Sequence, residues 1–450
     1  MAKNLLISGG RIIDLSQGWD RVGDLLISDG EIAWFGDKGK APSQSDLVIV
    51  EADGLVVCPG FIDLHCHLRE PGFEDKETIA TGTRAAAKGG FTTVCCMPNT
   101  NPPLDTRASV DYVRKATEME GVVRVLPVGC ITKCRQGKEL AEMGELADAG
   151  VIGFSDDGEP VSGSRVMSLA MEYSCDLGLP IMDHCEDKEL SNGGLVNEGW
   201  VSVRLGLKGI PAAAEEAFVA RDLALSQLTG ARIHICHVST AGSVELIRRA
   251  KDRGVAVTAE VTPCHLTLTE ERVMGPQEGR DKRLAYDTNA KVNPPLRSSK
   301  DVDALIKGLD EGIIDVIATD HAPHTLADKM CEFGLAPFGI SGFETALGCL
   351  MSLVHDGRLN LNTLVARLTL GPAGIIGNKS GELGTLKTGC GADVTLFDPG
   401  GEWVVSSQDF VSKGKNTPFE GYQFKGKVVA TIVAGRMVYQ DESVKVRKKR

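Results

Sequence analysis

The chain contains the stretch Leu55-Val-Val-Cys-Pro-Gly-Phe-Ile-Asp-Leu-His-Cys-His-Leu-Arg69, an apolar run that ends in two histidines and an arginine. Similar apolar runs recur through the middle of the sequence. Counting this one, they cover residues 55–64, 91–97, 123–130, 151–154, 179–182, 233–238, 255–261 and 313–318. Short and uniformly apolar strands are typical of a parallel sheet that is buried on both faces.

Helical patterns separate most of these runs, for example at residues 77–88, 138–147, 215–228, 242–251 and 302–309. Several of these stretches are followed by a glycine, a residue that commonly ends a helix. Eight strands alternating with helices predict an α/β fold in which the parallel sheet closes into a (β/α)8 barrel. In such barrels the functional side chains lie at the carboxyl ends of the strands.

Both ends of the chain are rich in strand patterns, at residues 5–15 and 24–35 and again at 392–398, 403–405 and 428–439. Neither end is long enough to bury a good core by itself. The sequence therefore predicts one small β-sandwich domain built from residues 1–54 and 385–450. Residues 55–384 then form the barrel domain.

The composition excludes several classes of protein. Of 450 residues, 42% are hydrophobic and 24% are charged, which is ordinary for a globular protein. A net charge of −12 argues against nucleic acid or an anionic membrane as a partner. We find no signal peptide and no membrane-spanning run, and the thirteen cysteines fit reduced thiols, so we expect a cytoplasmic protein.

The strongest chemical signal is the His65-Cys-His67 pair. Residues two apart on a strand point to the same side, and imidazole is the commonest metal ligand. The alternative, two histidines packed in the core, would leave two buried rings without partners. Other candidate ligands follow later strands, namely His184, His237, Asp320 and one of Asp156 and Asp157. This inventory is large enough for two divalent ions with a shared ligand.

At this point the sequence resembles the cyclic amidohydrolases, and among them the class I dihydroorotases most. The resemblance rests on motifs such as Asp63-Leu-His-Cys-His-Leu-Arg-Glu-Pro-Gly72, Met97-Pro-Asn-Thr-Asn-Pro102, Asp183-His-Cys-Glu186, Asn293-Pro-Pro-Leu-Arg297 and Ala318-Thr-Asp-His-Ala-Pro-His324. It implies a reversible cyclisation of N-carbamoyl-L-aspartate to (S)-dihydroorotate, a step of pyrimidine biosynthesis.

The resemblance also implies a metal site with two zinc ions in each subunit. His65, His67 and Asp320 bind one ion in this scheme, and His184 and His237 bind the other. Many relatives bridge the ions with a carboxylated lysine. Residues 151–158 contain no lysine, so this chain matches the subgroup in which an aspartate, here Asp157, and a hydroxide form the bridge.

The remaining roles also come from the resemblance. Asp320 acts as the catalytic acid and base. The substrate is bound by His67, Arg69, Asn99, Asn293, His324 and the backbone at Phe338 and Gly339. The forked guanidinium of an arginine matches a carboxylate. For Asn99 and Asn293 an alternative is turn formation, since both lie beside prolines.

Two other functions stay open at this point. One is a related cyclic amide hydrolase of the dihydropyrimidinase, hydantoinase or allantoinase type. The other is a non-catalytic partner of aspartate carbamoyltransferase, although every expected ligand is present. We further expect a homodimer or larger assembly, an aspartate carbamoyltransferase partner as an additional option, and a polar loop at 325–336 that closes over the site.

Overall fold

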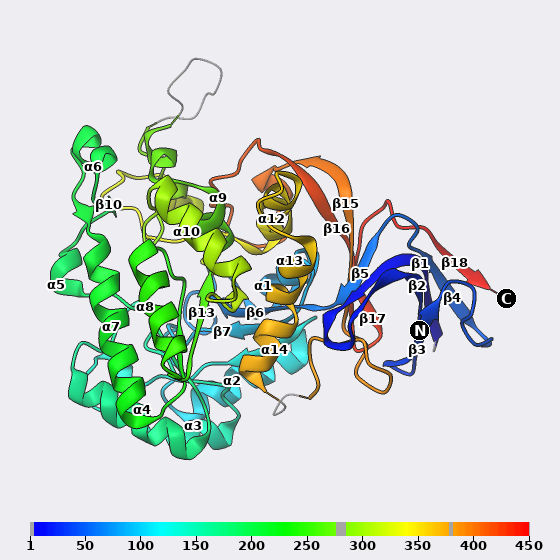
Figure 1. Cartoon of the computed structure of the whole chain (residues 1–450), viewed down its shortest axis with the longest axis horizontal. Coiled ribbons are helices and arrows are strands. Elements are labelled where there is room, and N and C mark those ends of the chain that lie inside the picture. Colours follow the sequence, from blue (N-terminus) through cyan, green and yellow to red (C-terminus); the bar gives the residue numbers. More distant parts are fainter. Residues whose placement is uncertain (1–3, 276–284, 378–380, 450) are drawn as a thin grey trace.

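A computed structural model describes residues 4–275, 285–377 and 381–449. Strands from both ends of the chain lie together at the right of Figure 1, and helices surround the inner strands at the left. The terminal strands form one nine-stranded sheet. Its members are β1 (Asn4–Asp14), β2 (Trp19–Ser28), β3 (Glu31–Asp37), β4 (Leu47–Glu51), β5 (Val56–Pro59), β15 (Val394–Val404), β16 (Gln423–Val433), β17 (Arg436–Gln440) and β18 (Val446–Lys449).

This terminal sheet branches at β1. One side of β1 pairs with β2, and the other side pairs first with β4 and then with β5. The change falls near a register shift between Ser8 and Gly10, where Gly9 has a φ of +81°. Glycine adopts this left-handed conformation without the steric cost of a side chain. One apolar core, which includes Ile7, Val57 and Leu396, joins residues from both ends of the chain.

The inner strands form two parallel sheets. The first contains β6 (Phe61–Cys66), β7 (Phe91–Cys96) and β8 (Arg124–Pro127). The second contains β9 (Ile181–Asp183), β12 (Ile233–Ile235), β13 (Val257–Val261) and β14 (Val316–Ile317). Every residue of β6 and β7 is buried, as expected for apolar strands that are covered on both faces.

Isolated backbone pairings connect the two inner sheets. Phe154 pairs in parallel with Gly129 on one side and with Ile181 on the other. Elsewhere, the Asp320 N–H donates to the His65 carbonyl at 3.0 Å, and the His67 N–H donates to the His321 carbonyl at 2.8 Å. The end of β6 and the segment that follows β14 therefore lie side by side.

The larger helices follow the inner strands and pack on one another, for example α4 on α7, α7 on α8 and α8 on α10. Threonine or serine side chains cap the starts of α1, α2, α8 and α10, which satisfies free backbone N–H groups. The helices are α1 (Ile79–Lys88), α2 (Arg107–Glu120), α3 (Met143–Ala149), α4 (Ser164–Leu177), α7 (Ala212–Thr229), α8 (Ala241–Asp252), α10 (Ser299–Asp310), α12 (Ala346–His355), α13 (Leu361–Leu368) and α14 (Leu370–Ile376).

Smaller elements complete the chain. They are α5 (Lys188–Ser191), β10 (Val196–Asn197), α6 (Trp200–Leu205), β11 (Gly209–Ile210), α9 (Pro263–Thr267) and α11 (Leu326–Lys329). Among the described residues, none of the helices combines the length and the apolar character that crossing a membrane requires.

Three sequence predictions need correction. The run at 55–64 is two strands in different sheets, β5 and β6, because the chain divides at Pro59-Gly60. A side chain at Gly60 would collide with Thr92, so the backbone passes close to β7 there. The helix predicted at 138–147 begins only at Met143, because Leu140 pairs with Thr132 instead. The run at 151–154 makes isolated pairings at Phe154 and no named strand.

Candidate active site

Polar side chains gather beyond the carboxyl ends of the inner strands. His65 lies on β6 and His67 just after it. His184 directly follows β9, His237 comes two residues after β12, and Asp320 comes three residues after β14. His237 and Asp320 have left-handed backbones, with φ values of +34° and +48°. Such conformations are uncommon outside glycine, and they recur at functional sites.

These side chains share a cavity of about 450 Å³. It is lined by every site residue predicted from the sequence except His65, namely His67, Arg69, Asn99, Asp157, His184, His237, Asn293, Asp320, His324, Phe338 and Gly339. His65 is fully buried next to it. The structure therefore brings together residues that span more than 270 positions of the sequence.

Asp157 lies at the centre of the histidines. Its Oδ1 atom is 3.3 Å from His65 Nε2 and 3.7 Å from both His184 Nδ1 and His237 Nε2. Its Oδ2 atom is 3.6 Å from His67 Nε2. The neighbouring Asp156 accepts instead from backbone N–H groups of the loop at residues 131–132. Only one carboxylate of this pair therefore faces the cluster.

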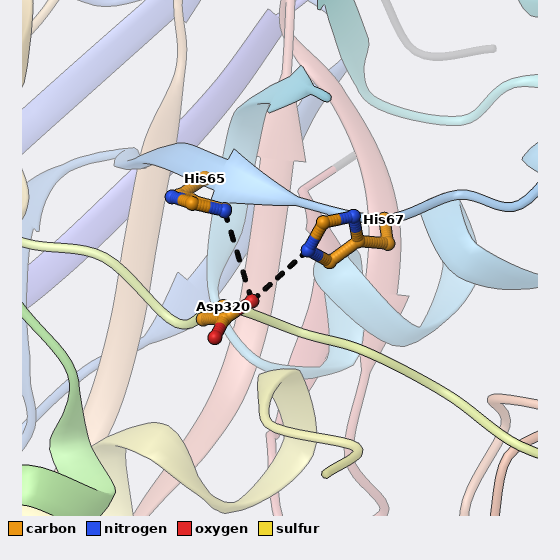
Figure 2. Close-up of side chains that lie close together, drawn as sticks. All are labelled: His65, His67 and Asp320. Carbon is orange, nitrogen blue, oxygen red and sulfur yellow. Dashed lines mark hydrogen bonds and ion pairs between the residues drawn. The ribbon is translucent and has the colours of Figure 1, made fainter. Parts of the chain in front are cut away.

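Asp320 approaches the first two histidines from the segment that follows β14 and lies beside β6. Its Oδ1 atom is 3.0 Å from His67 Nε2 and 3.7 Å from His65 Nε2. Figure 2 shows both rings turned toward this carboxylate. The other two histidines also face each other, with His184 Nδ1 3.0 Å from His237 Nε2.

In three of the four histidines, the ring nitrogen that faces away from the cluster contacts an oxygen acceptor. His65 Nδ1 is 2.7 Å from Glu260, His67 Nδ1 is 2.8 Å from the Asn99 side-chain oxygen, and His184 Nε2 is 3.0 Å from Glu186. An oxygen acceptor places the ring proton on the nitrogen that it contacts. The other nitrogen then presents its lone pair to the centre of the cluster, as a metal ligand must.

Charge in this buried cluster is balanced between imidazoles and carboxylates. Burial opposes ionisation of Asp157, yet the neighbouring His65 and His237 rings lower the pKa of its carboxyl well below the ordinary value. Burial likewise opposes ionisation of Asp320, and the hydrogen bond to His67 lowers its pKa. Both carboxylates are therefore ionised at neutral pH and can act as ligands.

The donor atoms fit a bound divalent ion. His65 Nε2 and Asp157 Oδ1 are buried, face each other and have no hydrogen-bond partner. Such an arrangement is costly unless a cation lies between the two atoms. Ligand atoms also cluster within 4.8 Å of one another in the groups His65–His67–Asp320 and His65–Asp157–His237. Imidazole nitrogen and carboxylate oxygen suit Zn²⁺ and related divalent ions.

The other end of the cavity is lined by Arg69 and His324. Arg69 contacts the Pro323 carbonyl at 3.2 Å and His324 Nε2 at 3.4 Å. Burial lowers the pKa of Arg69 to about 10, so it stays charged at neutral pH. Burial and Arg69 lower the pKa of His324 to about 2, so that ring is neutral. The positive charge at this end therefore comes from Arg69.

The other groups predicted to contact the substrate form hydrogen bonds within the protein. His324 Nε2 lies 2.8 Å from the Phe338 carbonyl. The Gly339 N–H donates to the Lys291 carbonyl at 2.9 Å, and Asn293 donates to Glu186 at 3.0 Å. A substrate role for these groups stays a prediction.

Sequence reasoning missed Glu260 and Glu186 as functional residues. Glu260 also lies 3.0 Å from His234 Nε2, so that histidine packs behind the site. A signal was present in the sequence, because Glu260 stands in the otherwise apolar strand β13. A carboxylate is rarely buried without a partner, so its position there indicates one.

We predict that Glu260→Gln weakens metal binding about 10–100-fold, the usual cost of changing a group that orients a metal ligand. The neutral amide can no longer stabilise the proton on His65 Nδ1. Competition with a chromogenic chelator measures the affinity directly. The control is Glu245→Gln on the exposed face of α8, which leaves the affinity unchanged. Equal affinities of the two variants would contradict the role of Glu260.

Comparison with known proteins places this chain in a family. Residues 54–243 match the family model described as dihydro-orotase-like. The chain is 50% identical to a dihydroorotase from Geobacter sp. (strain M21) over 97% of its own length and 99% of the relative. It is 51% identical to a dihydroorotase from Pelotomaculum thermopropionicum, covering 98% and 100% of the two chains.

The chain belongs to the dihydroorotase family. The family resemblance seen in the sequence is thereby confirmed. The protein is an enzyme of the cyclic amidohydrolase type, which acts on carbon–nitrogen bonds.

Solved structures show that the dihydroorotase family shares its fold with other cyclic amide hydrolases. The L-hydantoinase (dihydropyrimidinase) from Arthrobacter aurescens matches with a TM-score of 0.85 and 25% identity, over 99% of this chain and 98% of the other. The dihydropyrimidinase from Brevibacillus agri NCHU1002 matches with a TM-score of 0.82 and 22% identity, over 98% and 95%. Their lower identity separates them from the dihydroorotases named above.

Proposed function

We propose that this protein cyclises N-carbamoyl-L-aspartate reversibly to (S)-dihydroorotate and water, in the synthesis of pyrimidines. The observation that carries the proposal is the pairing of two features in one cavity. A histidine–aspartate cluster stands beside a charged guanidinium whose protein partners, the Pro323 carbonyl and His324, are both neutral. The substrate needs both features, because it carries an amide to be made or broken and a carboxylate that does not react.

The cluster would hold two divalent ions, which we propose to be zinc. His65, His67 and Asp320 would bind one ion, His184 and His237 the other, and Asp157 would lie between the two. The central position of Asp157 supports this assignment. When bound, such ions lower the pKa of a water molecule and polarise a carbonyl, which overcomes the poor reactivity of both water and an amide.

Asp320 would carry the proton. In the hydrolytic direction its carboxylate takes a proton from the attacking water and returns it to the ring nitrogen as the carbon–nitrogen bond breaks. In the synthetic direction it takes the proton from the attacking nitrogen and delivers it to the departing hydroxyl group, which leaves as water. Its lowered pKa keeps it ionised and able to accept a proton, and its place beside His67 at the cavity wall supports this role.

Arg69 would bind the carboxylate that does not react. Its fork of N–H groups matches two carboxylate oxygens, and neither of its protein partners, the Pro323 carbonyl and His324, carries a negative charge. Asn99 would act in two ways. Its oxygen holds His67, and its nitrogen, 3.3 Å from Asp157, lies at the cavity where a substrate would enter.

We also propose the finer architecture expected from the sequence. The pairings at Phe154 and between Cys66 and His321 support closure of the two inner sheets into one (β/α)8 barrel within residues 55–384. The core shared by both ends of the chain supports a separate β-sandwich domain of residues 1–54 and 385–450, to which β5 adds a strand.

A panel of cyclic amides tests the proposed function. We expect kcat/KM for dihydroorotate to exceed the values for hydantoin and allantoin by about 10²-fold or more, because a site built for a charged group rejects analogues that lack it. The structural similarity to hydantoinases favours the competing function. Faster turnover of hydantoin or allantoin would establish that function instead.

Other expectations rest on the resemblance or on the sequence alone and stay predictions. They are a cytoplasmic location, assembly into a homodimer or larger oligomer, and association with aspartate carbamoyltransferase. Sedimentation of the protein alone, followed by co-elution with the transcarbamoylase, tests the last two.

A further inference from the structure

Two lysines lie buried behind the carboxylate-binding end of the cavity. Lys291 is 2% exposed and Lys329 is 4% exposed. Burying an amine is costly unless hydrogen bonds replace its water. Nearly all buried lysines are therefore held by specific partners, and those partners indicate what the lysine does.

Lys291 holds one short segment at several points. Its Nζ donates to the carbonyls of Ala336 at 2.6 Å, Phe333 at 2.7 Å and Gly334 at 3.3 Å. Its own carbonyl accepts from the Gly339 N–H at 2.9 Å. The ammonium also lies 4.7 Å from the centre of the Phe338 ring, within the range of a cation–π interaction. Segment 333–339 is thus bonded to Lys291 from its first residue to its last.

Lys329 makes a second set of bonds to the same region. Its Nζ donates to the Pro337 carbonyl at 2.7 Å and to the Thr288 carbonyl at 3.1 Å. The Thr288 hydroxyl donates in return to the Lys329 carbonyl at 2.6 Å. Burial and the neighbouring Lys291 lower the pKa of Lys329 to about 7. Lys329 can donate both bonds whether its side chain is a neutral amine or a charged ammonium.

Segment 333–339 ends at the wall of the cavity. The Phe338 carbonyl holds His324, whose ring contacts Arg69. At Gly339, a side chain would lie 2.7 Å from Ala322 Cβ and 2.9 Å from the Ala322 carbonyl, so the backbone is packed closely against the neighbouring loop. A shift of this segment would therefore move His324 and change the surroundings of Arg69.

We propose that Lys291 and Lys329 are positioning residues that hold segment 333–339 in place and so preform the Arg69 end of the site. The inference rests on the proposed function in one respect only, namely that Arg69 binds the substrate carboxylate. It also implies that residues 333–336, the last part of the loop expected to close over the site, form a fixed wall instead. Preforming a binding surface removes the cost of ordering it when the substrate arrives.

The test compares Lys291→Met with Lys291→Arg and with Lys300→Met, a matched control on the exposed face of α10. Hydrogen exchange is measured at the amides of Leu335, Ala336 and Gly339, which are all hydrogen-bonded in the structure. We expect Lys291→Met to speed exchange at these amides about tenfold or more. In the wild type, local opening must break several bonds to the charged Lys291 side chain, whereas in the variant those bonds are already absent. Lys300→Met keeps the exchange rates of the wild type.

Kinetics supply the second readout. We expect Lys291→Met to raise KM for dihydroorotate about tenfold while kcat changes less than about threefold, since binding is weakened and the acid–base group is untouched. Lys291→Arg restores part of both effects. If Lys291→Met does not fold, Lys329→Met is measured in the same way. We expect it to speed exchange and raise KM in the same direction, by smaller factors.

Unchanged exchange and unchanged KM in a folded Lys291→Met protein would overturn the proposal, as would rapid exchange of these amides in the wild type. The proposed function fails in a different way. In that case the wild type does not turn over dihydroorotate, but the exchange measurement still decides whether the lysines hold the segment.

Discussion

We expect Asp320→Asn to lower kcat for dihydroorotate by about 10²–10⁴-fold, the range that one positioned acid–base group contributes. Asparagine has nearly the same shape and keeps an oxygen toward His67 and His65, so the cluster can still assemble. It cannot accept a proton at neutral pH. The loss should appear in kcat and kcat/KM alike, because the interaction is made only in the transition state.

Two measurements accompany this variant. Metal content by mass spectrometry shows whether Asp320→Asn still binds at least one ion, which separates a lost base from a lost site. Asp303→Asn, on the exposed face of α10, serves as the control for removing a carboxylate from the surface. Turnover within about tenfold of the wild type, with metal retained, would exclude Asp320 as the proton carrier.

Removal of metal is expected to have an effect of similar or larger size. Lewis-acid stabilisation by a bound metal is worth several kcal/mol, which corresponds to about 10³-fold or more in rate. We therefore expect protein treated with a chelator to lose nearly all turnover of dihydroorotate and to regain it when Zn²⁺ is restored. The buried and unpartnered His65 Nε2 and Asp157 Oδ1 atoms are the structural reason.

Thermal unfolding provides an independent readout of the same ion. A ligand that binds only the folded state raises the melting temperature as its concentration rises. The chelated protein should melt at a lower temperature than the restored protein. A combined His65→Ala and His67→Ala variant should show a smaller dependence, because only the ligands of the other ion remain. Full activity after chelation, with metal shown to be absent, would contradict this two-ion scheme.

Local patterns made much of the fold predictable. Apolar runs separated by helical stretches indicated the inner strands, because strand and helix periods are read directly from neighbouring residues. The His-x-His pair was equally accessible, since alternation along β6 alone puts both rings on one side. The strand ends then placed His184, His237 and Asp320 near them, as the cavity shows.

What escaped prediction depends on contacts between distant parts of the chain. The run at 55–64 looks continuous, yet Pro59-Gly60 sends its two halves to different sheets. From the sequence alone, Glu260 is only a polar residue in an apolar run. Its contact with His65 becomes visible once the fold places β13 behind that histidine. The same holds for Lys291, whose partners at 333–336 lie more than 40 positions away. Neither periodicity nor composition carries this information.

The pairing of β6 with the segment after β14 has a consequence for the order in which the protein is made. His65 leaves the ribosome early, but the Asp320 N–H that bonds to its carbonyl is synthesised about 255 residues later. At about 5–20 residues per second, roughly 13–50 seconds pass between the two. During that interval His65 and His67 have no Asp320 beside them, so the His65–His67–Asp320 group is complete only after about 70% of the chain has been synthesised.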